Sequence, residues 1–259
     1  MHETVSIGGL KIVYGHPHDL AGMIEVFVLN IYDVDRIPEG ALVIDLGAGV
    51  GDFAVAAGHR VRKRGLVIAV EPNPTDFGLL RENVEANRLD NVVALRAVIG
   101  DPEQDVFLSF KGETFSARAI TLSNLLRDAG LTFADCRNRP IVLKVDVEGA
   151  EVEVLRNLLP LLEQVRFIAI ELHGTKSEVD AVLIPQGFKF LRTSNLKCLL
   201  RTLMFSVRHP LEAIDIWRRF RASSDYPGVR KILSGIEIAN SPGLMVGVYQ
   251  PTRLDDKSR

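Results

Sequence analysis

The sequence is poor in cysteine, in long apolar runs and in excess charge of either sign. Its 259 residues include two cysteines, which lie far apart without metal-ligand spacing, and this favours an intracellular protein with ordinary thiols. The formal net charge of −2 provides no global field that would attract nucleic acid or acidic membranes. No apolar run approaches the ~18 residues that span a bilayer, and no signal pattern opens the chain. We therefore expect a cytoplasmic protein, for which peripheral membrane contact stays open.

The stretch LVIDLGAGVGDF, residues 42–53, is the most informative part of the sequence. An apolar run ends in Asp45, and a helical pattern follows three glycines at alternate positions: Gly47, Gly49 and Gly51. This pattern predicts a buried strand that enters a tight loop at a helix N-terminus, where bare backbone can approach a ligand. A second apolar run ends in Glu71, whose carboxylate can accept hydrogen bonds from both hydroxyls of a ribose. Together these features predict a nucleoside pocket at the carboxyl edge of a parallel sheet.

The acidic residues around the glycines favour S-adenosylmethionine (SAM) over a dinucleotide. A dinucleotide site has the pattern GxGxxG/A and places the pyrophosphate at the helix N-terminus. Here Asp52 follows the third glycine, where its carboxylate would repel phosphates. SAM has no phosphate, and Asp45 suits the ammonium group of its methionine end. A NAD-dependent oxidoreductase is thus a weaker alternative.

Strand and helix patterns alternate along most of the chain, which predicts an α/β doubly wound sheet. We expect a lead-in over residues 1–40 and a single domain over 41–259. Core strands are predicted at 42–46, 67–71, 92–97, 141–146 and 166–173, with a last strand at 243–249. Helices are predicted near 52–63, 74–88, 149–163 and 176–185. In the third of these helices, Glu151 is expected to face water.

Four ionisable side chains are predicted to meet at the carboxyl edge of the sheet. Asp146 and Glu148 follow one apolar strand, and Glu171 and His173 lie on one face of the next strand. A hydroxyl acceptor needs a general base, and histidine has the reference pKa closest to neutrality. The carboxylates could orient His173, or they could hold a divalent cation that binds two substrate oxygens. We expect the acceptor pocket between Glu148 and His173.

Residues 197–235 form a basic segment with interleaved apolar residues, predicted to be a helical insertion. Leu211, Ile214 and Trp217 share one helical face, and arginines are expected on the other. The segment could be a helical layer that packs on the core and presents a solvated basic face. It could also be a cover for the acceptor pocket, a membrane-surface helix or an RNA contact.

The quoted motifs resemble the FkbM family of SAM-dependent methyltransferases over about residues 40–190. The resemblance depends on VIDLGAGVGDF, AVEPNP, LKVDVEGAEVEVL and IAIELHG. It implies a class I, Rossmann-like methyltransferase with a mostly parallel seven-stranded sheet, which methylates hydroxyls of sugars, glycans or natural-product-like acceptors. It also implies that Asp45 and the three glycines line the methionine end of SAM, that Glu71 holds the ribose, and that Asp101 lies near the adenine. The remaining expected cofactor contacts are Ala48, Pro72 and Asn73.

An RNA methyltransferase is the main functional alternative, because the basic segment could bind phosphates. The near-neutral charge of the chain disfavours strong binding to a nucleic-acid backbone. The strand that ends in DVEG also lacks the NPPY-like motif common in base N-methyltransferases.

Overall fold

The computed structural model describes residues 2–100, 104–110, 112–222 and 244–252. Its centre is a seven-stranded sheet in the order β11-β12-β10-β9-β3-β4-β5. The five strands β10 (Val165–His173), β9 (Ile141–Val145), β3 (Leu42–Leu46), β4 (Leu66–Val70) and β5 (Val92–Leu95) run parallel. The strand β12 (Leu244–Pro251) is antiparallel to both β10 and β11 (Phe188–Arg192). The predicted mostly parallel, seven-stranded sheet is therefore confirmed.

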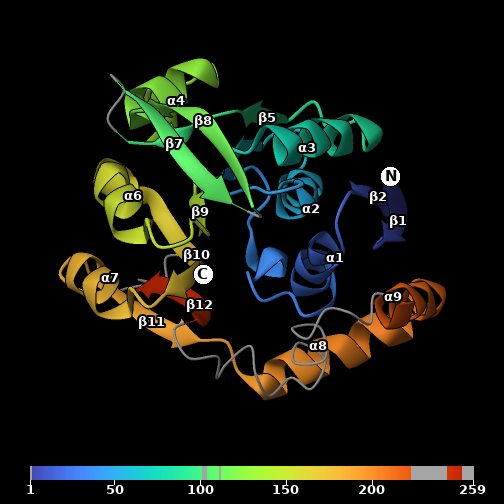
Figure 1. Ribbon diagram of the computed structural model, residues 1–259. Helices are drawn as coiled ribbons and strands as arrows, with labels where there is room; N and C mark the ends of the chain where they lie inside the picture. The colour runs from blue at the N-terminus through green and yellow to red at the C-terminus, as the bar shows by residue number, and fades with distance from the viewer. Residues whose placement is uncertain (1, 101–103, 111, 223–243, 253–259) are drawn as a thin grey trace.

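Both faces of the sheet are covered, which explains why its central strands are apolar throughout (Figure 1). Successive side chains of a strand point to opposite faces of the sheet, so Val43 belongs to one buried cluster and Leu42 and Ile44 belong to the other. Helices α2 (Asp52–Val61) and α3 (Pro74–Ala86) follow β3 and β4. Helix α6 (Glu151–Leu158), with its 3-10 continuation η3 (Leu159–Gln164), follows β9, and α7 (Lys176–Leu183) follows β10. All four agree with the predicted helices to within a few residues.

A β-hairpin of β7 (Asp105–Phe110) and β8 (Glu113–Ile120) leaves the main sheet and extends over its edge (Figure 1). The short strand β6 (Val98–Ile99) pairs with β8. Helices α4 (Leu122–Asp128) and α5 (Phe133–Cys136) then lead back to β9. The hairpin thus forms one wall above the sheet.

The N-terminal lead-in packs on the domain as a cap. It consists of the strand pair β1 (Glu3–Ile7) and β2 (Leu10–Tyr14), the helix α1 (Pro17–Met23), the π-helical turn η1 (Ile24–Val28) and the 3-10 turn η2 (Val34–Arg36). The buried amide of Asn83 in α3 fixes this cap: its Oδ1 accepts from the Val13 amide at 2.6 Å and its Nδ2 donates to the Val13 and Val50 carbonyls. The cap therefore borders the loop that follows β3.

Helices α8 (Asn195–Arg208) and α9 (Pro210–Ala222) confirm the predicted helical character of the basic segment in its described part. The expected orientation of α9 is wrong. Leu211, Ile214 and Trp217 are exposed, whereas Ala213 and Ile216 are buried against the rest of the chain. Helix α9 contacts β1 and buries Ala213 and Ile216, so Leu211, Ile214 and Trp217 lie toward the outside.

Candidate active site

The loop between β3 and α2 explains why three glycines occur there. Gly47, Gly49 and Gly51 all have positive φ, a conformation that favours glycine. A Cβ on Gly47 would lie 1.8 Å from the carbonyl oxygen of Asp146, and one on Gly51 would lie 2.5 Å from Cδ1 of Leu80. At Gly49, no atom of the described residues other than Gly49 and its two chain neighbours lies within 4 Å of the corresponding position. Gly47 and Gly51 thus allow close packing, while Gly49 exposes backbone to open space.

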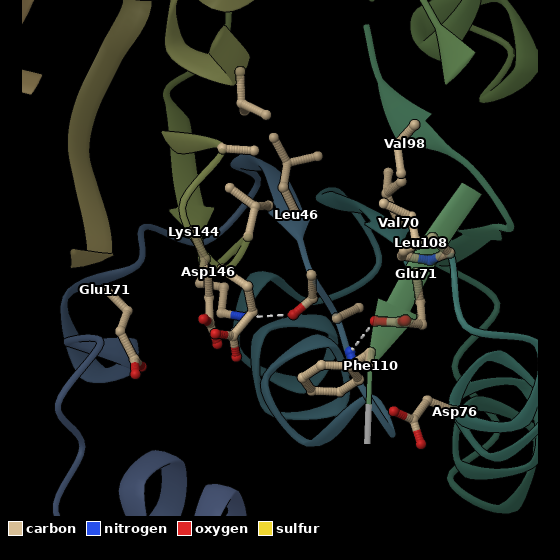
Figure 2. Close-up of a pocket in the computed structure, with 18 of the residues that line it drawn as sticks. Leu46, Val70, Glu71, Asp76, Val98, Leu108, Phe110, Lys144, Asp146 and Glu171 are labelled. Carbon is tan, nitrogen blue, oxygen red and sulfur yellow. Dashed lines mark hydrogen bonds and ion pairs between the residues drawn. The ribbon is translucent and has the colours of Figure 1, made fainter. Parts of the chain in front are cut away.

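That open space belongs to a cavity of about 820 Å³ at the carboxyl edge of the sheet. The loops after β3, β4 and β9 line it, together with β10, the β7–β8 hairpin, and α1 and η1 of the cap. Figure 2 shows Glu171 and Asp146 on one side of the cavity, and Glu71, Asp76 and Phe110 on the other. The cavity is therefore acidic at both ends and is partly walled by apolar side chains of the hairpin.

Glu71 is held in place by backbone amides at one end of the cavity. Its Oε2 accepts from the Gly49 amide at 2.7 Å and its Oε1 accepts from the Asn73 amide at 2.8 Å. Burial raises the pKa of Glu71 to about 7, although these two hydrogen bonds oppose the rise. Ala48 and Pro72 also line the cavity, as predicted. Asn73 does not: its Oδ1 caps α3 by accepting from the amides of Thr75 and Asp76.

A buried lysine that the sequence analysis missed lies beneath the glycine loop. Lys144 Nζ donates to the Gly47 carbonyl at 2.5 Å and lies 3.5 Å from Asp45. It also lies 3.4 Å from Asp146, which is labelled beside it in Figure 2. Asp45 is fully buried and has no hydrogen-bond partner in the part of the chain that the structure describes. It does not line the cavity, where we expected it to lie. Burial raises the pKa of Asp45 to about 6, against the opposing effect of Lys144. Burial would lower the pKa of Lys144, but the carboxylates around it raise it above its usual value.

The four predicted catalytic side chains do converge, and we call them the edge cluster: Asp146, Glu148, Glu171 and His173. The three carboxylates line the other end of the cavity, whereas His173 lies behind them and is not part of its wall. The His173 Nε2 lies 3.2 Å from Oε2 of Glu148 and 3.7 Å from Oε1 of Glu171. Glu148 has a φ of +50°, which is unusual for a residue with a side chain and is typical of functional loops. Asp146, Glu171 and His173 each offer one ligand atom within 4.8 Å of the others, so they could hold a metal ion.

Glu151 orients His173, contrary to the expectation that it faces water. It is fully buried at the first turn of α6. Its Oε1 lies 2.8 Å from His173 Nδ1 and accepts from the Gly149 amide at 2.8 Å, and its Oε2 accepts from the Thr175 hydroxyl at 2.8 Å. The turn through Glu148 and Gly149, both at positive φ, rotates the start of the helix so that Glu151 points under the site. Helical periodicity alone does not reveal this rotation.

Two side chains of the edge cluster, His173 and Glu171, have strongly raised pKa values. The hydrogen bond to Glu151 is the main reason that the pKa of His173 rises to about 9, although burial opposes it. Burial and the nearby Asp146 raise the pKa of Glu171 to about 7. The Tyr32 hydroxyl donates to Glu171 Oε2 at 3.0 Å. At neutral pH His173 is therefore mostly protonated, and Glu171 is poised between its two states.

The cap contributes a further acidic side chain that had no signal in the sequence. Glu25 lines the cavity from η1, and burial together with Glu171 and Asp146 raises its pKa well above the usual value. A π-helical turn frequently marks a functional site. Among the described residues, none from α8 or α9 lines the cavity, so the expected cover from 197–235 is wrong for that part. Asp101 lies outside the described residues.

This sheet order, with a glycine loop after the first parallel strand and a carboxylate after the next, defines a class I methyltransferase. Residues 45–201 match the methyltransferase FkbM domain, so the chain belongs to this family and is a SAM-dependent methyltransferase. The oxidoreductase alternative is therefore set aside.

Curated relatives include methyltransferases of differing substrates. "Methyltransferase 1" of Beauveria bassiana is 25% identical over 63% of this chain and 78% of its own length. "Hexuronic acid methyltransferase AglP" of Haloferax volcanii is 28% identical over 60% of this chain and 64% of its own length. Among solved structures, a precorrin-6y C5,15-methyltransferase from Geobacter metallireducens aligns with a TM-score of 0.39 and 14% identity, over 63% of this chain and 71% of that one.

The residues present fit SAM. Gly49 leaves open space where a side chain would block a ligand, and Glu71 keeps carboxylate lone pairs available for ribose hydroxyls. The several carboxylates around one buried lysine leave excess negative charge. Such a surplus suits a ligand that carries an ammonium and a sulfonium group.

Proposed function

We propose that this methyltransferase transfers the methyl group to a hydroxyl oxygen of a sugar, glycan or natural-product-like acceptor. The observation that carries the proposal is the carboxylate of Glu171, which opens on the cavity beside Asp146 with a pKa of about 7. A hydroxyl is a weak nucleophile until a base removes its proton, and a base works best when its pKa is close to the operating pH. The name of one relative, the hexuronic acid methyltransferase of Haloferax volcanii, supports a sugar acceptor.

Glu171 is the proposed general base. When bound, SAM supplies an electrophilic methyl group. Tyr32 donates to Glu171 Oε2, and Oε1, which lies 3.7 Å from His173 Nε2, is the oxygen proposed to take the acceptor proton. Proton removal of this kind contributes about 10²–10⁴-fold to a rate.

His173 is proposed to position Glu171 rather than to act as the first base. Its pKa of about 9 keeps the ring charged at neutral pH, so it has no free nitrogen to accept a proton. Glu151 holds Nδ1, and Nε2 faces Glu148 and Glu171. The charged ring thereby lessens the repulsion among the carboxylates and fixes their orientation. The alternative in which Asp146, Glu171 and His173 hold a divalent cation uses the same side chains.

The charged contacts of α8 and α9 do not favour RNA as the acceptor. Lys197 and Arg201 both pair with the buried carboxylate of Asp33, at 2.6 and 2.7 Å. Arg219 pairs with Glu3 and Asp215. These cations hold the helices to the cap, which reduces the positive charge available to a phosphate backbone.

The acceptor can be identified with methyl-labelled SAM. The protein is incubated with an extract of the cells that make it, and the labelled product is isolated and its new bond determined. We expect an O-methyl group on a small molecule or glycan, with label that survives ribonuclease treatment. Label on nitrogen or carbon, or label released by ribonuclease, would refute the proposal.

A further inference from the structure

Helices α8 and α9 form a hairpin whose inner side is firmly attached to the cap. Cys198 and Phe205 of α8 and Ala213 and Ile216 of α9 are buried in the same cluster as the cap's apolar residues. The Glu212 carboxylate accepts from the Gly8 amide at 2.7 Å, which ties α9 to the turn between β1 and β2. The orientation of the hairpin is therefore fixed, and its other side must face outward.

The outward side of the hairpin is apolar over the whole length of α8. Six of its side chains are between 51% and 81% exposed, at the spacing of one helical face: Leu196, Leu199, Leu200, Leu203, Met204 and Val207. On α9, Leu211 is 80% exposed, Ile214 48% and Trp217 37%. We call these nine residues the outer face. A continuous apolar surface of this kind marks a site of interaction.

The charges that border the outer face are positive. Arg208 and Arg218 are exposed, and each lies one helical turn from a residue of the outer face, Met204 and Ile214. Helix α8 contains no acidic residue. The two acidic residues of α9 are engaged within the chain, Glu212 with Gly8 and Asp215 with Arg219. The surface thus combines a broad apolar stripe with a cationic border.

We propose that the outer face docks this protein onto an anionic lipid bilayer. An amphipathic helix with an apolar face and flanking arginines lies in the plane of the interface, and its cations attract acidic headgroups. The helices have 14 and 13 residues, and no described helix is long and apolar enough to cross a membrane, so the hairpin lies on the bilayer. A second copy of the chain is a less suitable partner. A two-fold contact through the outer face would bring the arginines of one copy near those of the other, and these like charges repel.

This docking would hold the cavity close to the lipid surface. Helix α8 packs on η1, and η1 carries Glu25 into the cavity. Among the described residues, α8 and η1 thus lie between the outer face and the site. The inference concerns where the enzyme works, and it does not depend on the acceptor or on the identity of the base.

The chain carries a natural reporter, because Trp217 is its single tryptophan. Its fluorescence would be recorded with vesicles of phosphatidylcholine alone and with vesicles that also contain phosphatidylglycerol, and binding would be measured by co-sedimentation. We expect binding to the anionic vesicles, with a blue shift of the emission and quenching by lipids brominated near the headgroup. Added salt should weaken binding because it screens the arginines.

Two double variants separate the apolar from the ionic contribution. L203Q/V207Q should weaken vesicle binding about tenfold or more, since each side chain loses apolar burial in the lipid. R208Q/R218Q should weaken it about fivefold or more for each charge at low salt, and only for anionic vesicles. The matched control is F107Q/I184Q, which removes two exposed apolar side chains elsewhere and should bind as the wild type does.

Three results would overturn the proposal. In the first, wild-type protein is a dimer by sedimentation velocity and L203Q/V207Q is a monomer, which assigns the face to a second copy. In the second, the wild type is monomeric and stays with the supernatant, which shows that the outer face does not bind the bilayer. In the third, the control variant loses vesicle binding as much as L203Q/V207Q does. SAM binding by calorimetry, unchanged in all variants, confirms that each is folded.

Discussion

Replacing Glu151 by glutamine should release His173 from its charged state. The Glu151 carboxylate is fully buried, and its hydrogen bond is the largest cause of the raised His173 pKa of about 9. Glutamine keeps an acceptor for the Gly149 amide but has no charge to favour the imidazolium. The His173 pKa should therefore fall from about 9 toward the ordinary 6.5, as measured by an NMR titration of the six histidine rings.

The same change should cost about 1.5–3 kcal/mol of unfolding free energy, the range for hydrogen bonds to a charged group. Because its pKa is raised, His173 stabilises the folded state fully below pH 6.5, and this contribution is lost as the pH rises through about 9. The hydrogen bonds from His173, Gly149 and Thr175 outweigh the effect of burial and lower the pKa of Glu151. The lowered pKa stabilises the folded state above pH 4.5. The difference between wild type and E151Q in urea unfolding should thus be largest between pH 4.5 and 6.5 and should shrink toward pH 9 and above.

The matched control is E163Q, which changes an exposed glutamate. It should alter neither the His173 titration nor the pH dependence of stability. A His173 midpoint that stays near 9 in E151Q would refute the reasoning, as would a loss of stability equal at all pH values.

Three further changes test other parts of the site. Gly49→Val should abolish SAM binding in calorimetry because the valine side chain would project into the open cavity, and a wild-type affinity would contradict this expectation. The change should also lower the free energy of unfolding by about 1–2 kcal/mol, the cost of a left-handed backbone for a residue with a side chain. Lys144→Met should destabilise the protein by about 3–5 kcal/mol because it leaves Asp45 buried without a cation, and the added change Asp45→Asn should recover much of that loss. Failure of that rescue would refute the pairing. Chelator treatment should leave turnover unchanged, whereas a loss restored by Mg²⁺ would assign the edge cluster to a metal ion.

The sequence predicted the sheet and the position of the site because both follow from local patterns. Apolar runs of strand length between amphipathic helices indicate parallel pairing, and the carboxyl ends of such strands share one edge. Asp146, Glu171 and His173 could therefore be placed together before any contact was known. The glycine spacing likewise identified the bare backbone at Gly49.

The side chains that tune the site could not be predicted in the same way. Lys144 lies inside an apolar strand, and nothing local indicates that two carboxylates neutralise it. Glu25 and Tyr32 reach Glu171 from more than 130 residues away in the chain, through the packing of the cap. The buried side of α9 is formed by Ala213 and Ile216, and a rule that counts the largest apolar residues chooses the other side of the helix.

Measuring turnover and SAM affinity for Glu171→Gln on the identified acceptor tests the account most directly. The variant removes the proposed base and keeps the shape of the side chain and an acceptor for the Tyr32 hydroxyl. We predict that the turnover number falls about 10²-fold or more while the SAM dissociation constant changes little. A turnover number equal to that of the wild type would contradict the assignment of Glu171 as the base of an O-methyl transfer.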